Sequence, residues 1–163
     1  MPDQHYYTVV FPFSTDRKRV LLGLKKRGMG EGLWNGFGGK PEPGETMDQC
    51  AIRELQEESS LTATAMDRVA VLIMRLESGP ERVIFVYTVT GFSGDVCESD
   101  EMRPRWFDLE NLPYSQAYTE ARIWWPYMLA GRTFVADFTF NDDSIVRQEC
   151  REVQQQDLDT YLP

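Results

Sequence analysis

The stretch GKPEPGETMDQCAIRELQEESSL, residues 39–61, joins a glycine-containing loop to a segment that carries several acidic side chains. Apolar residues recur at helical spacing within it, so we expect a helix over Glu45–Ser59. Glu54, Glu57 and Glu58 are three and four residues apart, which places their carboxylates on one helical face. Three carboxylates this close repel one another. Such a cluster persists either fully solvated or around a hard cation that takes several oxygen ligands.

The sequence before this helix is rich in glycine. Eight of the 12 glycines of the chain lie between Gly23 and Gly44. A glycine-dense stretch in a globular protein is either a mobile loop or a place where the backbone approaches a ligand closely. The composition of this stretch by itself leaves both interpretations open.

Length and charge narrow the class of protein. The 163 residues fit one domain, and we expect a single domain over residues 1–163, with an ordered core over about 6–153 and a polar, frayed tail over 154–163. A net charge of −9 argues against binding of a nucleic acid polymer. No apolar run is long enough to cross a membrane, so we expect no membrane association. Three cysteines without a CxxC pair favour a reducing compartment, and we expect a cytoplasmic location without excluding mitochondrial or nuclear sharing.

Hydrophobic patterning predicts seven or eight strands and two main helices, without the alternation of strand and helix that a parallel sheet requires. This favours an α+β fold with one mixed sheet system and helices on its faces. The first two strands read as a hairpin, and the second helix ends before Gly131. Besides the helix over Glu45–Ser59, the expected elements are strands at Tyr6–Phe13, Arg19–Leu24, Val69–Leu76, Arg82–Thr90, Arg103–Phe107, Thr133–Phe140 and Ser144–Cys150, and a helix at Ala117–Ala130.

The spacing of residues 39–61 resembles the Nudix box. The chain reads Gly39-x5-Glu45-x7-Arg53-Glu54-Leu55-x-Glu57-Glu58-x-Ser60-Leu61. It departs from the box only at Ser60, where the box has the glycine that ends the helix in a left-handed conformation. The resemblance implies the Nudix α/β/α sandwich and hydrolysis of a nucleoside diphosphate linked to another moiety.

The same resemblance implies a metal site. It would use Mg²⁺, with Mn²⁺ as a substitute, to neutralise phosphate oxygens and activate water. Glu45 and Arg53 would pair and orient the loop against the helix. The residues implied at the metal are Gly38, Gly39, Glu54, Glu57, Glu58 and Glu101, of which the four glutamates would also be catalytic.

Beyond the box, segments such as residues 20–28, 34–40 and 98–104 are similar to those of the animal MutT homologues, a group of oxidized purine nucleoside triphosphatases. This implies hydrolysis of 8-oxo-dGTP or 2-hydroxy-dATP to monophosphate and pyrophosphate, in nucleotide-pool sanitation, by a monomer whose partner is a small-molecule nucleotide. The residues implied to bind substrate are Thr8, Lys25, Asn35, Phe37, Gly38, Gly39, Lys40, Met74, Tyr118 and Glu120.

One departure bears on base specificity. That group has Trp-Pro-Asp-Asp before the second helix, where this chain has Tyr118-Thr119-Glu120-Ala121. Tyr118 can stack on a base and Glu120 can hydrogen-bond to one, but Ala121 can do neither. Two alternatives therefore stay open: the same chemistry on an alkylated purine, an ordinary dNTP or a dinucleotide polyphosphate, and a non-catalytic Nudix domain that senses a nucleotide.

Overall fold

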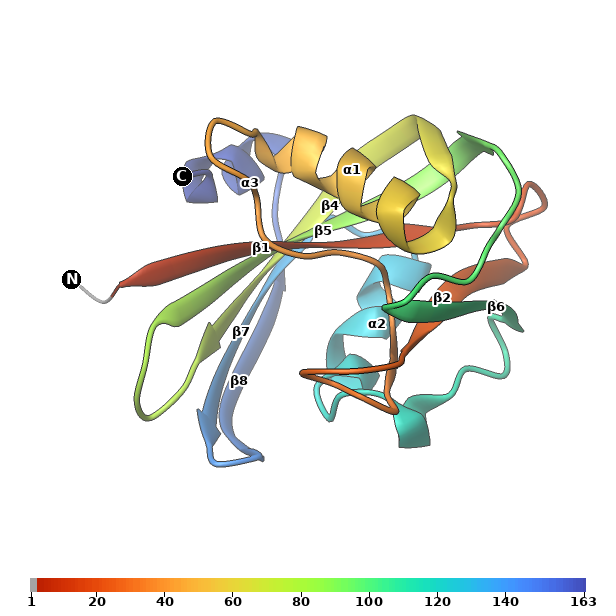
Figure 1. The fold of residues 1–163 in the computed structure, drawn as a ribbon. Helices are drawn as coiled ribbons and strands as arrows, with labels where there is room; N and C mark the ends of the chain where they lie inside the picture. The colour runs from red at the N-terminus through yellow and green to blue at the C-terminus, as the bar shows by residue number, and fades with distance from the viewer. Residues whose placement is uncertain (1–2) are drawn as a thin grey trace.

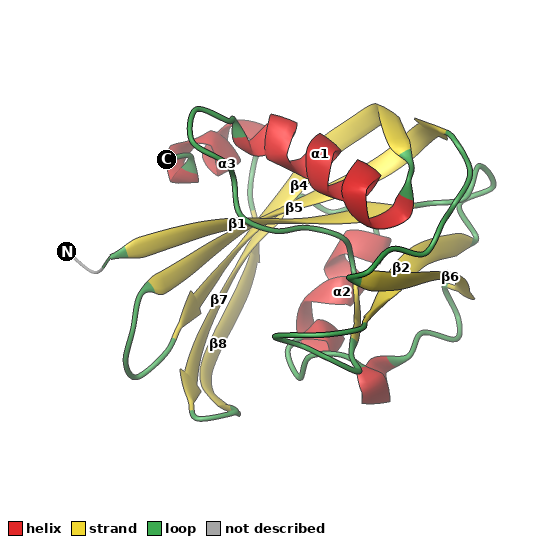
Figure 2. Ribbon diagram, viewed as in Figure 1, coloured by secondary structure: helices red, strands yellow, loops and turns green. Residues whose placement is uncertain are grey.

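The structure, a computed structural model, describes residues 3–163 and contains two β-sheets with helices packed around them (Figures 1 and 2). The strands are β1 (Gln4–Pro12), β2 (Arg19–Lys25), β3 (Trp34–Asn35), β4 (Thr62–Arg75), β5 (Glu81–Ser93), β6 (Met102–Asp108), β7 (Phe134–Asn141) and β8 (Ser144–Glu152). The helices are α1 (Met47–Ser59), α2 (Ala121–Leu129) and α3 (Gln155–Leu158), with short 3-10 turns η1 (Tyr114–Gln116) and η2 (Asp159–Tyr161).

The larger sheet is mixed and has the order β1-β5-β4-β7-β8. β1 runs parallel to β5 and β4 runs parallel to β7, while the other neighbours are antiparallel. The smaller sheet, β3-β2-β6, is antiparallel. The prediction of an α+β fold with a mixed sheet and two main helices is confirmed, although two sheets replace the single sheet system expected.

The predicted hairpin between the first two strands is wrong. Ser14–Lys18 forms a tight turn, but it delivers the chain into the smaller sheet, and only the bridge between Phe13 and Val20 joins β1 to β2. The last five residues of β1 are all buried, and the strand pairs with β5 along its whole length. Alternating hydrophobicity identifies a strand, but it does not identify the strand's partner.

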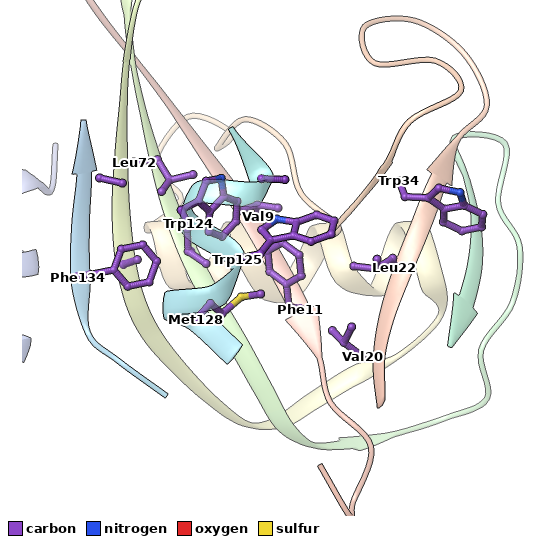
Figure 3. Packing of buried hydrophobic residues seen from close by; sticks show 14 of the residues in the cluster. Val9, Phe11, Val20, Leu22, Trp34, Leu72, Trp124, Trp125, Met128 and Phe134 are labelled. Carbon is purple, nitrogen blue, oxygen red and sulfur yellow. The ribbon is translucent and has the colours of Figure 1, made fainter. Parts of the chain in front are cut away.

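Helices cover both sides of the larger sheet. α1 lies on one side in Figure 1, where its Met47, Ala51 and Leu55 pack into one buried apolar cluster. α2 lies on the other side, and Trp124, Trp125 and Met128 fill a second cluster between the sheets (Figure 3). These two clusters fix α1 and α2 relative to the strands, and so they fix the loops that connect them.

The ends of α1 follow local rules. Thr46 is the N-cap, and its side chain accepts a hydrogen bond from the Gln49 N–H while the Gln49 side chain accepts one from the Thr46 N–H. This capping box starts the helix at Met47, two residues later than predicted. At the other end Ser60 adopts φ 68°, the left-handed conformation that the glycine of the Nudix box would take more easily.

Several boundaries differ from the prediction. β4 begins at Thr62 rather than Val69, because bulges between Ala63 and Ala70 interrupt the alternating pattern that signals a strand. α2 begins at Ala121 rather than Ala117, since η1 and the turn after it occupy the preceding residues.

The prediction that residues 154–163 fray is wrong. They form α3 and η2, and the Leu158 side chain is fully buried in the cluster beneath α1. The Arg68 guanidinium also holds this segment: it donates to Asp159 at 2.7 Å and to Asp48 of α1 at 2.9 Å. A single apolar residue in a polar stretch is a weak sequence signal, and its burial depends on a groove built by other elements.

Within residues 3–163 no helix has the length and hydropathy that a membrane crossing requires.

Candidate active site

A cavity of about 690 Å³ opens between the two sheets, the glycine-rich loop and the start of α2. This volume is typical of pockets that enclose small molecules. Of the residues predicted to bind substrate, those that line the cavity are Thr8, Lys25, Asn35, Gly38, Gly39, Met74, Tyr118 and Glu120, and of the four predicted catalytic glutamates Glu58 lines it as well.

The backbone of Gly38 and Gly39 forms one wall, and a side chain at either position would meet neighbouring atoms. A Cβ on Gly38 would lie 1.8 Å from the Thr8 carbonyl oxygen, and one on Gly39 would lie 2.5 Å from Glu54 Oε1. The loop is fixed against β1, because the Thr8 N–H donates to the Gly39 carbonyl at 2.9 Å. Glycine is therefore required at Gly38 for close approach to the backbone of β1, whereas the contact at Gly39 is with the flexible end of the Glu54 side chain.

Glu58 is the one of the four predicted catalytic glutamates that lines the cavity. Its side chain is 5% exposed, and its Oε1 accepts a hydrogen bond from the Gly38 N–H at 2.8 Å. Burial raises its pKa to about 7; the Gly38 N–H opposes this shift, while the charges of Glu54 and Glu101 add to it. The buried carboxylate thus lies next to other negative groups, an arrangement that a cation would stabilise.

Glu54 and Glu57 share the guanidinium of Arg53. Arg53 Nη1 donates to Glu54 at 3.0 Å and to Glu57 at 3.2 Å. Burial raises the pKa of Glu54, whereas the Glu57 side chain is 53% exposed. Both carboxylates lie on the same helical face as Glu58, as the spacing predicts.

Arg53 and Glu45 form a two-bond ion pair. Arg53 Nε donates to Glu45 Oε2 at 2.7 Å and Nη2 donates to Oε1 at 2.9 Å. These hydrogen bonds lower the pKa of Glu45 to about 2. Arg53 Nη2 also donates to the Lys40 carbonyl at 3.1 Å, so this pair ties the glycine loop to the helix.

Glu101 lies across from α1, at the start of β6, and is held by two cations. It accepts hydrogen bonds from Lys25 Nζ at 3.0 Å and from Arg27 Nη2 at 2.9 Å, which lower its pKa. Lys25 lines the cavity and Glu101 does not. The structure therefore places Glu101 near Glu58 but paired with basic residues.

The carboxylate groups at this site are chemically suited to bind a hard divalent cation. Glu54, Glu57 and Glu58 supply carboxylate oxygens, and the Glu54 carboxylate lies against the Gly39 backbone, where no Cβ intervenes. In residues 3–163, however, no three acidic, cysteine or histidine side chains converge on one point, because Arg53, Gly38 and Lys25 already engage the glutamates. Ligation would require these side chains to reorient from those partners.

The other end of the cavity carries groups suited to a flat polar ring. Asn35 Oδ1 accepts from the Gly36 N–H at 2.8 Å, which leaves its amide N–H groups free of that contact. The Glu120 side chain is 9% exposed, and burial raises its pKa. Tyr118 packs against Gly30, where a Cβ would lie 2.3 Å from the tyrosine hydroxyl. This end offers an aromatic ring and hydrogen-bond donors.

Three residues that the sequence argument considered for binding of substrate or base lie outside the cavity: Phe37, Lys40 and Ala121. Phe37 does not line it: its ring is fully buried in the cluster beneath α1, since the residue bridges to Val10 of β1. Lys40 is exposed, with its ammonium 5.5 Å from the centre of the Tyr7 ring. Ala121 is 2% exposed and belongs to the core around α2.

Sequence reasoning missed several cavity residues. Met29 and Arg82, the aromatic residues Tyr7, Trp124 and Phe140, and the turn residues Asp142 and Asp143 also line it. Trp124 carried a weak signal as a large aromatic just after the segment that departs from the animal MutT homologues. Arg82 and the two aspartates carried none, because only the pairing of distant strands brings them together.

Comparison with known proteins places the chain in a family. A model of the NUDIX domain matches residues 3–127, so the chain belongs to the Nudix family. It is 42% identical over 138 residues to the oxidized purine nucleoside triphosphate hydrolase of Danio rerio. This match covers 83% of this chain and 88% of that protein. It is 38% identical over 155 residues to the Mus musculus protein of the same name. That match covers 94% of this chain and 98% of that protein.

The fold also matches a crystal structure of a MutT protein from Bacillus halodurans. The TM-score is 0.79 with 21% identity, over 90% of this chain and 97% of that one. At this identity the likeness concerns the fold.

Proposed function

We propose that the protein hydrolyses oxidized purine nucleoside triphosphates, such as 8-oxo-dGTP and 2-hydroxy-dATP, to the monophosphate and pyrophosphate. The observation that carries this proposal is the lining of a single cavity, which brings the Gly38–Gly39 backbone and Glu58 together with Asn35, Tyr118 and Glu120. A nucleotide needs both a phosphate site and a base site in one pocket. The printed names of the Danio rerio and Mus musculus relatives support the same substrate class.

The proposal includes Mg²⁺, with Mn²⁺ as a substitute. Glu54, Glu57 and Glu58 would hold it beside the Gly38–Gly39 backbone, with Glu101 as a further acidic group. The ion supplies charge neutralisation at phosphate oxygens and a more acidic bound water.

The chain's own residues orient the substrate. The Lys25 ammonium lines the cavity and favours negative charge there. At the base end Tyr118 offers a stacking surface, Asn35 offers an amide hydrogen-bond donor, and Glu120 offers a buried carboxyl group. The walls of Leu72, Met74 and Ile84 exclude water around the ring.

A second candidate keeps the chemistry and changes the base. Since Ala121 is buried in the core, it leaves Glu120 as the acid that the start of α2 presents to the cavity. A base that needs a single acidic partner, such as that of an alkylated purine dNTP or an ordinary dNTP, would suit this pocket, and a dinucleotide polyphosphate would be a larger form of the same ligand.

The test is a substrate panel with purified protein and Mg²⁺, measuring pyrophosphate release. We expect 8-oxo-dGTP and 2-hydroxy-dATP to give higher kcat/KM than dGTP and dATP. Glu57→Gln should lower kcat by about 100-fold or more, since an ionic ligand contributes several kcal/mol at the transition state. Glu149→Gln, an exposed acid on β8 outside the cavity, is the matched control and should retain full activity.

Two results would contradict the proposal. Cleavage of another nucleotide with both oxidized substrates left intact would remove the substrate class. Nucleotide binding without pyrophosphate release, unchanged in Glu57→Gln, would instead indicate a non-catalytic sensor.

We further propose that the protein acts as a monomer in a reducing compartment such as the cytosol. Its three cysteines are all free, and Cys97 is exposed. An exposed unpaired thiol is typical of reducing surroundings. Light scattering on the purified protein checks the oligomeric state, which we expect to be unchanged by a reductant.

A further inference from the structure

Arg82 is a cavity residue that the arrangement described above does not use. It is the second residue of β5 and pairs with Met74 of β4. The pair of Ile84 and Leu72 lies two residues further along the same strands. All four of these side chains line the cavity, because they lie on the same face of the larger sheet. Arg82 therefore adds a positive charge to an otherwise apolar floor.

Among residues 3–163 the Arg82 guanidinium forms no ion pair with an acidic side chain. Within residues 3–163 its one side-chain contact is a weak hydrogen bond from Nη1 to the Met29 sulfur at 3.7 Å. By contrast Arg75, on the same pair of strands, forms ion pairs with Glu81 and Asp137. Asp142 and Asp143 line the same cavity but form no ion pair with Arg82. A half-buried guanidinium that lacks a carboxylate retains most of its five donors for a ligand.

Arg82 lies toward the base end of the cavity. Its contact with Met29 places it beside the loop that holds Gly30, and Gly30 packs against Tyr118. Its charge also acts on Tyr118: burial raises the pKa of that phenol, and the positive charges of Lys25 and Arg82 oppose the rise. The Tyr118 ring and the Arg82 guanidinium thus face one ligand volume.

We propose that Arg82 is a specificity-determining residue that donates hydrogen bonds to a carbonyl oxygen of the purine base. This inference rests on the proposed nucleotide function. A guanidinium is a donor only, so it favours ring positions that carry an acceptor oxygen over positions that carry hydrogen or an amino group. Oxidation of a purine adds such an oxygen, which gives the pocket a direct means to prefer oxidized bases.

The experiment is equilibrium binding of four monophosphates that differ only at the base: dAMP, 8-oxo-dAMP, dIMP and 8-oxo-dIMP carry an amino group or a carbonyl at position 6, and hydrogen or a carbonyl at position 8. Calorimetry without divalent metal keeps hydrolysis out of the measurement, so failure of the proposed catalysis would not affect it. For the wild type we expect the carbonyl-bearing bases to bind more tightly than dAMP. Arg82→Met keeps the aliphatic stem and should weaken binding of those three by about ten- to a hundredfold, and that of dAMP by much less.

Arg82→Lys separates recognition of the base from recognition of phosphate. It keeps the charge and loses the planar fork, so we expect it to recover only part of the carbonyl preference. Equal loss for all four nucleotides in Arg82→Met, recovered in Arg82→Lys, would assign Arg82 to phosphate and overturn the proposal. Unchanged affinities in Arg82→Met, or no measurable binding by the wild type, would also overturn it. Thermal unfolding of both variants, which alter a half-buried rim residue, should match that of the wild type.

Discussion

Ser60 shows how a single residue can depart from a motif without altering its geometry. Ser60 takes φ 68° at the end of α1, which is a left-handed backbone conformation. Its N–H donates to the Gln56 carbonyl at 2.9 Å, as expected for a helix that ends in this conformation. A residue with a Cβ pays about 1–2 kcal/mol for this conformation, which glycine adopts freely. The backbone therefore keeps the glycine geometry, and the cost falls on stability rather than on the acidic face of the helix.

We expect Ser60→Gly to increase the free energy of unfolding by about 1 kcal/mol, because relief of the left-handed strain exceeds the added entropy of glycine in the unfolded chain. Urea unfolding followed by circular dichroism measures the change. Ser60→Ala, which keeps the Cβ and removes the hydroxyl, is the control and should resemble the wild type. Equal stabilisation by both substitutions would point to the hydroxyl instead of the backbone.

At the scale of elements, the C-terminal segment acts as part of the core and not as a tail. α3 is only four residues long and would not form alone. It is held by the burial of Leu158 beneath α1 and by the bonds of Arg68 to Asp159 and Asp48. Tertiary contacts thus supply the stability that the local sequence lacks.

We expect Leu158→Ala to lower the free energy of unfolding by about 2 kcal/mol or more, since it removes a fully buried side chain. Leu162→Ala, four residues on and 38% exposed, is the matched control and should change stability by less than about 0.5 kcal/mol. Chemical unfolding of both variants tests this. Equal small effects would mean that residues 154–163 fray after all.

At the scale of the whole molecule, the net charge of −9 is unevenly distributed. Residues 1–40 carry seven basic and three acidic side chains, and the acidic excess lies in the remainder. The cavity lies where the two parts meet, with Lys25 on one side and Glu58 on the other. Each glutamate of this region has a protein partner: Arg53 for Glu54 and Glu57, the Gly38 N–H for Glu58, and Lys25 for Glu101.

Since these partners already balance the carboxylates, we expect removal of divalent ions with EDTA to abolish pyrophosphate release while leaving the midpoint of thermal unfolding nearly unchanged. Nucleotide affinity should fall as well, because the ion that would neutralise phosphate oxygens is then absent. Adding Mg²⁺ back should restore both activity and affinity. A large drop in the unfolding midpoint on chelation would show that the metal is structural, contrary to this expectation.

The sequence could predict what depends on neighbours along the chain. Glu54, Glu57 and Glu58 share a face because a helix fixes their spacing, and Thr46 caps that helix through a contact three residues away. The sequence suggests that glycine is required at Gly38, but it does not show the reason. The clash that a Cβ would make is with the carbonyl of Thr8, thirty residues earlier on another element.

The amino-acid sequence by itself determined the Nudix family, the mixed α+β character and the acidic helix, because each is encoded in short-range spacing. The tertiary structure alone decided that β1 pairs with β5 instead of β2, that the last ten residues pack, and that Phe37 is core. It also brought Arg82 into the cavity with Tyr118. Strand pairing and burial join residues far apart in sequence, and their free energy arises only when the whole chain is folded.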